Sequence, residues 1–144
     1  GTVIETQKDT ERLIENTHES VKLTLDTGHM LFAKGDSKSI LQNYHERILH
    51  VHCKDIRKQV LEKSLKEDLS FRGAFLEGAF TVPGDGCIDY QPLFNVLKNN
   101  NYSGWLVVEA EQDPAKANPL EYAKIGYKYL TDTLKKSEIE IYKN

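Results

Sequence analysis

The sequence lacks any apolar run that approaches the roughly 18 to 20 residues of a membrane span. It also lacks the charged, then apolar, then small-residue pattern of a secretory signal peptide. Its two cysteines, Cys53 and Cys87, lie far apart without CxxC spacing, so neither a zinc-thiolate site nor a disulfide framework is expected. We therefore expect a protein of the reducing cytoplasm that has no membrane partner.

The sequence also lacks a large excess of one charge, because 19 Lys and Arg are spread among 22 Asp and Glu without a basic stripe. A surface that follows a nucleic-acid backbone needs clustered positive charge, so no nucleic-acid partner is expected. The 144 residues have the size of one globular domain, or of part of a larger one. Because the chain begins with Gly1 and not with Met, we expect it to belong to a longer polypeptide.

The hydrophobic pattern alternates between helical and strand periods, which is typical of an α/β fold. Strands are predicted over residues 21–26, 48–54 and 104–109. Helices are predicted over residues 6–16, 37–46, 59–67, 90–100 and 120–136, with a loop through Gly35 after the first strand and a turn at 82–86. Such alternation implies parallel strands joined by right-handed crossovers. Three parallel strands alone leave two bare edges, so we expect part of a larger α/β fold.

Each predicted strand ends in a residue that can bind a metal: Asp26 in LTLD, His52 in LHVH and Glu109 in LVVE. In a (β/α)₈ barrel the carboxyl ends of the strands meet on one face, where such side chains converge. Two carboxylates and one imidazole suit Mn²⁺, Co²⁺, Fe²⁺, Mg²⁺ or Zn²⁺, with positions open for a substrate. The alternative is that each acidic residue is only a helix cap or turn former.

Further polar residues follow the second predicted strand. His50, His52 and Lys54 alternate and so point to one side, and a core face rarely carries three such groups without a polar site. Asp55 is a candidate to orient His52 or Lys54 by a hydrogen bond. Trp105 is predicted to pack between strand and helices.

Four segments resemble the C-terminal half of the inosose dehydratase family, within the xylose-isomerase-like TIM barrel superfamily. They are VKLTLDTGH, RILHVHCKDIR, FTVPGDGCIDY and GWLVVEAEQDPAKANPLEYA. The VVEAEQDPAKANP run is the most specific, whereas DTGH, HxHxKD and PGDG alone would indicate only the superfamily. The resemblance implies that residues 1–144 are about three βα units from the C-terminal half of a (β/α)₈ barrel, whose N-terminal half would precede Gly1.

The resemblance also implies a metal site. Asp26, His52 and Glu109 correspond to ligands from the sixth, seventh and eighth barrel strands, and a fourth ligand would lie before Gly1. The fragment alone is therefore expected to be incompetent, unless another chain supplies the missing half. Mn²⁺ or Co²⁺ is the expected ion, with Mg²⁺, Fe²⁺ and Zn²⁺ as alternatives. His29 corresponds to a family histidine beside the metal, with substrate contact or proton transfer as its expected role.

The implied activity is that of a lyase which dehydrates 2-keto-myo-inositol (inosose) to a trihydroxycyclohexane dione in inositol catabolism. A proton leaves the carbon next to the ketone and a hydroxyl departs from the next carbon, through an enediolate that the ion stabilises. The general base and acid are expected among His29, His50, Lys54 and Glu109, without an assignment of either role. The partner is then a small cyclic polyol ketone.

Three further residues are candidates for substrate binding. Gly84 and Gly86 of VPGDG would let the backbone approach the substrate, or would serve only the turn. Arg57 would clamp a substrate oxygen, or would lie on the solvated surface.

Other functions stay open at this point. A metal-dependent sugar isomerase or epimerase of the same superfamily needs the same ion and enediolate but loses no water. An abasic-site nuclease is disfavoured, because that branch uses extra histidines and no histidine follows His52 here. The third alternative is a non-catalytic half-barrel that acts as an interaction segment. A homo-oligomer is compatible with each of these.

Overall fold

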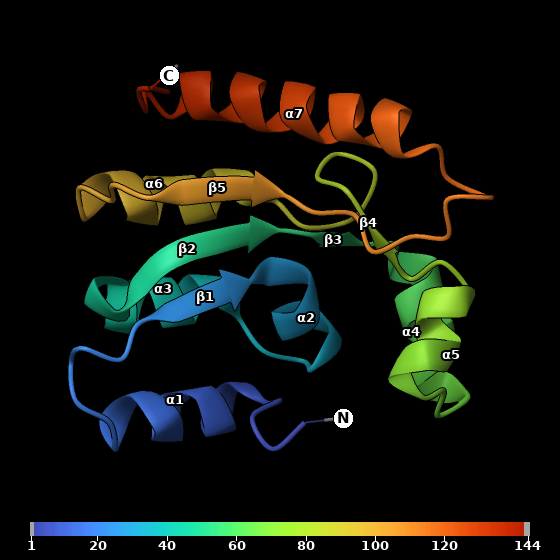
Figure 1. The fold of residues 1–144 in the computed structure, drawn as a ribbon, viewed down its shortest axis with the longest axis horizontal. Helices are drawn as coiled ribbons and strands as arrows, with labels where there is room; N and C mark the ends of the chain where they lie inside the picture. The colour runs from blue at the N-terminus through green and yellow to red at the C-terminus, as the bar shows by residue number, and fades with distance from the viewer. Residues whose placement is uncertain (1, 143–144) are drawn as a thin grey trace.

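Three parallel strands form the central sheet of the computed structural model, which describes residues 2–142 (Figure 1). β2 (Ile48–Cys53) lies between β1 (Leu23–Asp26) and β5 (Trp105–Val108). Both pairings are parallel. The predicted α/β architecture with parallel strands is therefore confirmed.

Helices cover one face of this sheet, with α3 and α6 behind the strands in the view of Figure 1. The helices are α1 (Gln7–Glu15), α2 (Thr27–Phe32), α3 (Ser37–Tyr44), α4 (Lys58–Lys66), α5 (Phe71–Leu76), α6 (Tyr90–Asn99) and α7 (Pro119–Lys136), with a 3₁₀ turn at His45–Arg47. Thr6 and Asp9 form a capping box at the start of α1, and Asp36 and Asp89 cap α3 and α6, so these helices begin within one residue of the predicted positions. No helix within residues 2–142 is long and apolar enough to cross a membrane.

The strand register divides the side chains between two faces. Leu25 pairs with Val51 and Val51 with Leu106, and this row packs into the core formed with the helices. Because side chains alternate along a strand, the next row faces away from the helices. His50 and Trp105 are paired in that second row. The second face therefore carries the polar and potentially functional residues.

The prediction that Trp105 packs between strand and helices is wrong, because 64% of its surface is exposed. Leu106, its neighbour along β5, packs against the helix-side core. Since side chains of adjacent residues in a strand point to opposite faces, Trp105 points to the uncovered face.

The prediction of a loop from residue 27 to Gly35 is also wrong, because α2 (Thr27–Phe32) follows β1 directly. Thr27 and Gly28 have low helix propensity, and the helix is too short to show a full hydrophobic period. It forms because Asp26 caps it and because Met30 is buried in the core.

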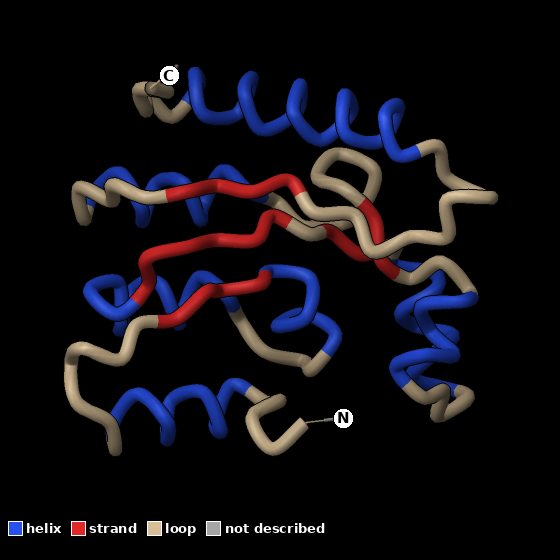
Figure 2. Tube along the Cα trace, viewed as in Figure 1, coloured by secondary structure: helices blue, strands red, loops and turns tan. Residues whose placement is uncertain are grey.

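A second unit, of which only the helix over residues 59–67 was predicted, lies beyond the carboxyl ends of the strands. The short strands β3 (Asp55–Ile56) and β4 (Phe80–Thr81) pair antiparallel and carry α4 and α5 between them. Figure 2 shows both helices standing apart from the central sheet. They pack on their own small core, which includes Ile56, Leu61 and Phe80. This excursion forms one side of the carboxyl-end face.

Two glycines give a test of the packing. A Cβ at Gly86 would lie 2.1 Å from Asp55 Oδ1, whereas a Cβ at Gly73 in α5 would meet nothing closer than 3.4 Å. We expect Gly86→Ala to lower the free energy of unfolding by about 1 to 3 kcal/mol, because the buried carboxylate must move. Gly73→Ala should be neutral or stabilise by up to about 1 kcal/mol. Denaturant unfolding of both variants measures this difference, and equal effects would contradict it.

Candidate metal centre

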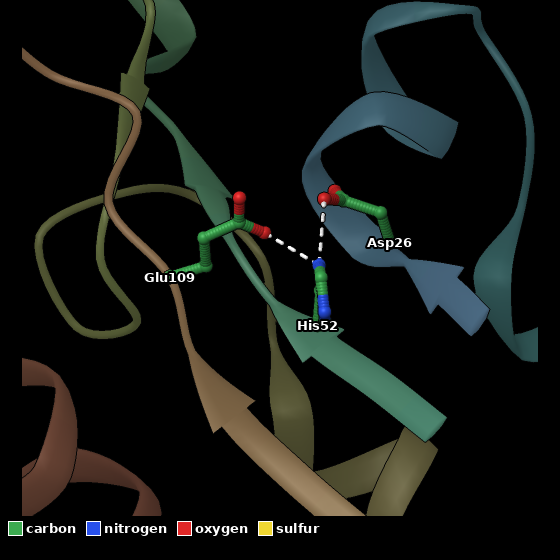
Figure 3. A group of neighbouring side chains, drawn as sticks. All are labelled: Asp26, His52 and Glu109. Atoms are coloured by element: carbon green, nitrogen blue, oxygen red, sulfur yellow. Dashed lines mark ion pairs between the residues drawn. The ribbon is translucent and has the colours of Figure 1, made fainter. Parts of the chain in front are cut away.

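Asp26, His52 and Glu109 come together where β1, β2 and β5 end (Figure 3). One potential ligand atom from each lies within 4.8 Å of the other two. His52 Nδ1 is 2.6 Å from Glu109 Oε2 and 3.8 Å from Asp26 Oδ2. The parallel register explains the meeting, because Asp26 pairs directly with His52 and β5 continues to Glu109 just past its last residue. The three residues predicted from strand ends thus form one cluster.

The chemistry of this cluster fits a divalent cation. Glu109 Oε2 is buried and has no hydrogen-bond partner within residues 2–142, although His52 Nδ1 lies only 2.6 Å away. Buried carboxylate oxygens rarely stay without a partner, and here the two atoms meet without the geometry of a hydrogen bond. Two carboxylates and one imidazole are ligands that Mn²⁺, Co²⁺, Fe²⁺ and Zn²⁺ accept.

The two carboxylate oxygens of Asp26 face different partners, so a helix cap and a place in the cluster are compatible. Its Oδ1 accepts a hydrogen bond from His29 N at 2.8 Å and so caps α2. Its Oδ2 lies 3.1 Å from Lys54 Nζ, on the side of the cluster. One oxygen therefore begins the helix while the other remains for the site.

Lys54 lies inside the site, with only 1% of its side chain exposed. Its Nζ is 3.1 Å from Asp26 Oδ2, 3.5 Å from Glu109 Oε1 and 2.8 Å from Glu111 Oε2. Burial works to lower the pKa of Lys54, but the hydrogen bond to Glu111 and the charges of Asp26 and Glu111 together outweigh it. The pKa of Lys54 therefore lies above its usual value, and the group is an ammonium at neutral pH.

The DTGH segment provides the space that Lys54 occupies. Thr27 Oγ1 donates to the Lys54 carbonyl at 2.7 Å, and the Tyr90 hydroxyl donates to the same oxygen at 2.9 Å. A Cβ at Gly28 would lie 2.7 Å from Lys54 Cγ, so only glycine leaves room for the lysine stem. Both Thr27 and Tyr90 are fully buried. The backbone and the side chain of Lys54 are thus both held in place.

Glu111 is a further site residue that was not predicted from the sequence. Glu111 Oε2 lies 2.9 Å from His29 Nε2, and Lys54 donates to the same oxygen. Burial would raise the pKa of Glu111, but the hydrogen bonds from Lys54 and His29 hold it below its usual value. The available signal was the spacing: Glu109 and Glu111 are two residues apart after a strand, and alternation places such residues on one side.

His29 and His50 differ in their relation to the cluster. His29 Nδ1 lies 3.5 Å from Asp26 Oδ2, and its ring is 43% exposed. His50 shares a face with His52, with ring centroids 5.9 Å apart, but lies one step back along β2 and outside the ligand group. Of the two, His29 is the imidazole beside the cluster.

The remaining predicted residues lie in or near the turn at 82–86. Arg57 donates to the carbonyl of Gly78 and to Asp85 Oδ2, both at 2.7 Å, so its guanidinium is engaged within the protein. Gly84 has φ +90°, which favours glycine. Gly86 leaves space for a carboxylate. These contacts give Arg57, Gly84 and Gly86 structural roles, and their contact with a substrate stays a prediction.

The expectation that Asp55 orients His52 or Lys54 by a hydrogen bond is wrong. Asp55 Oδ1 accepts from Ile56 N at 2.7 Å and from Ile88 N at 2.9 Å. Residues in a strand alternate, so Asp55 points away from its neighbour Lys54 and into the turn. Burial raises the pKa of Asp55 despite these backbone donors. Asp55 thus ties the turn to the sheet.

Comparison with known sequences agrees with the geometry. The family described as xylose isomerase-like TIM barrel matches residues 1–133. An inosose dehydratase of Clostridium beijerinckii is 52% identical over 133 residues, which cover 92% of this chain and 45% of that protein. The rhizopine catabolism protein MocC of Rhizobium meliloti is 49% identical over 130 residues, covering 90% of this chain and 40% of that protein. The chain therefore spans less than half the length of these curated relatives.

Comparison with solved structures gives the same fold. The crystal structure of the IOLI protein, which contains a bound zinc atom, matches with a TM-score of 0.65 and 21% identity, covering 92% of this chain and 45% of that one. At this identity the likeness concerns the fold alone. The predicted resemblance to inosose dehydratases and the predicted partial barrel are both confirmed. The chain belongs to the xylose isomerase-like TIM barrel family.

Proposed function

We propose that this chain is part of a lyase that dehydrates 2-keto-myo-inositol to a trihydroxycyclohexane dione. One observation carries the proposal: a chain 52% identical to a curated inosose dehydratase also gathers Asp26, His52 and Glu109 into one cluster beside a buried lysine. The proposed substrate is a small cyclic polyol ketone, and inositol catabolism is the proposed pathway.

Asp26, His52 and Glu109 would hold the metal, with Mn²⁺ or Co²⁺ as the proposed ion. When bound, a divalent ion supplies Lewis-acid chemistry: it polarises a ketone and makes the neighbouring C–H more acidic. The fourth ligand is proposed to come from outside residues 1–144, because the curated relatives are more than twice as long as the matched region. Residues 1–144 would then be the C-terminal half of the barrel.

The chain's own residues would bind and move the protons. His29 exposes its imidazole beside the cluster, where it can take a proton from the carbon next to the ketone. Lys54 Nζ is an ammonium with a fixed position, from which it can donate a proton to the departing hydroxyl or stabilise negative charge on a substrate oxygen. Glu109 is a second base candidate. His50 lies one step farther from the cluster.

The product identifies the reaction. With the intact protein, a divalent ion and 2-keto-myo-inositol, we expect a product that is lighter by one water and absorbs as an enolisable dione. Mass spectrometry and ultraviolet absorbance measure both properties. A ketose of unchanged mass would instead support the isomerase or epimerase alternative. Metal binding without any turnover would support the non-catalytic half-barrel.

Two histidines on one strand face give a matched test of the metal site. Loss of a residue that only supports a metal ligand weakens metal binding by roughly 10- to 100-fold. We expect His52→Ala, which removes a proposed ligand, to weaken metal binding by more than this. His50→Ala should retain the ion, because His50 lies outside the ligand group. Metal content after dialysis, measured by mass spectrometry, compares the two variants.

Chelation extends this test to activity. Removal of divalent ions should abolish dehydration, and addition of Mn²⁺ or Co²⁺ should restore it. Dehydration that survives complete chelation would overturn the metal-dependent mechanism. Equal metal content in the two histidine variants would overturn the ligand assignment.

A further inference from the structure

We propose that Glu111 is a positioning residue that holds Lys54 and His29 together as one unit at the edge of the metal centre. The inference rests on the proposed function and deepens it, because it names the group that places the proton-transfer candidates. Glu111 itself is not among the ligand group of Asp26, His52 and Glu109 found within residues 2–142.

The unit is a closed triangle of polar atoms. Lys54 Nζ lies 2.8 Å from Glu111 Oε2, and His29 Nε2 lies 2.9 Å from the same oxygen. The third side, from Lys54 Nζ to His29 Nε2, measures 3.0 Å. One carboxylate oxygen therefore sets the separation of an ammonium and an imidazole.

The two partners of Glu111 differ in how firmly they are otherwise held. Lys54 keeps its position through the buried hydrogen bonds to its carbonyl and through ion pairs with Asp26 and Glu109. Outside the triangle, the half-exposed ring of His29 has a longer polar contact with Asp26 at 3.5 Å. Edge contacts with the rings of Phe71 and Phe80, each at 5.4 Å, limit its tilt but provide no hydrogen bond. Glu111 thus adds a second link between the ring and the fixed lysine, beside their direct 3.0 Å contact.

The triangle also holds the ring in either protonation state of His29 Nε2. A protonated Nε2 donates to Glu111 Oε2, and an unprotonated Nε2 accepts from Lys54 Nζ. Without the Glu111 carboxylate, the Lys54 ammonium at 3.0 Å would be the partner left to His29 Nε2 within the triangle.

The substitution Glu111→Gln can test the positioning role of Glu111 separately from any support of the fold or of the ion. In Glu111→Gln, Lys54 remains paired with Asp26 and Glu109, so the lysine stays compensated and the three ligands are unchanged. A matched control is Glu138→Gln, which removes an exposed ion pair between Glu138 and Lys98 at 2.7 Å, away from the site. The two substitutions are chemically identical and each breaks one lysine–glutamate contact.

The experiment compares Glu111→Gln, His29→Asn and their combination with the wild-type intact protein. We expect Glu111→Gln to lower kcat by roughly 10- to 100-fold, with metal content and KM close to wild type. The combination should lower kcat no further than the more severe single variant, because residues that act as a unit have non-additive effects. Glu138→Gln should leave kcat unchanged. A wild-type kcat in Glu111→Gln, or multiplicative effects in the combination, would overturn the proposal.

Loss of metal in Glu111→Gln would also overturn it, because Glu111 would then support the ion and not the pair. If Glu111→Gln fails to fold, Glu111→Asp takes its place, since it keeps the charge but withdraws it by one methylene. Its kcat should then fall between wild type and His29→Asn, and a kcat equal to wild type would contradict the proposal.

A readout without turnover separates this inference from the proposed function. In metal-free protein, the ring ¹³C–¹H signals of His29 should shift or broaden in Glu111→Gln and stay unchanged in Glu138→Gln. Unchanged His29 signals in both variants would overturn the inference even where the wild type dehydrates keto-inositol. Perturbed signals in a protein that does not dehydrate keto-inositol would leave the inference standing and overturn the proposed function alone.

Discussion

The parallel register of β1, β2 and β5 is the constraint on which the candidate site depends. Asp26 lies directly opposite His52, and β5 places Glu109 one position past its end beside the same imidazole. Backbone hydrogen bonds between strands set this register, and the buried row of Leu25, Val51 and Leu106 reinforces it. A slip by one residue on any strand would turn its ligand toward the helices. The meeting of these three side chains is therefore decided first by the pairing of the strands and only then by side-chain chemistry.

The buried ammonium group of Lys54 is the central positive charge of the site. Lys54 lies among three carboxylates, which compensates much of the negative charge at the strand ends. Burial of an ammonium is tolerated only with such partners, and each partner here also has a second task. Asp26 caps a helix, Glu109 belongs to the ligand group and Glu111 holds His29. This sharing of carboxylates joins the ligand group to the proton-transfer candidates.

The excursion that contains α4 and α5 builds one wall of the same face. Its core residue Phe80 contacts the His29 ring, and Phe71 at the start of α5 contacts the same ring. Arg57, Asp55 and Gly86 connect this excursion to the turn at 82–86 through hydrogen bonds and close packing. The conspicuous PGDG and Arg57 elements of the sequence thus serve to place a wall beside the site.

Sequence alone determined the elements whose signals are local. Caps at Thr6, Asp36 and Asp89 start helices where helices were predicted, and Asp26, His52 and Glu109 stand where the predicted strands end. Only tertiary structure decided the rest, because those features depend on partners distant in the chain. The helix after Asp26 forms through burial of Met30, and Glu111 acquires its role from contacts 57 and 82 residues away along the chain. Local propensity contains no information about such partners, whereas the pairing of strands brings them within hydrogen-bond distance.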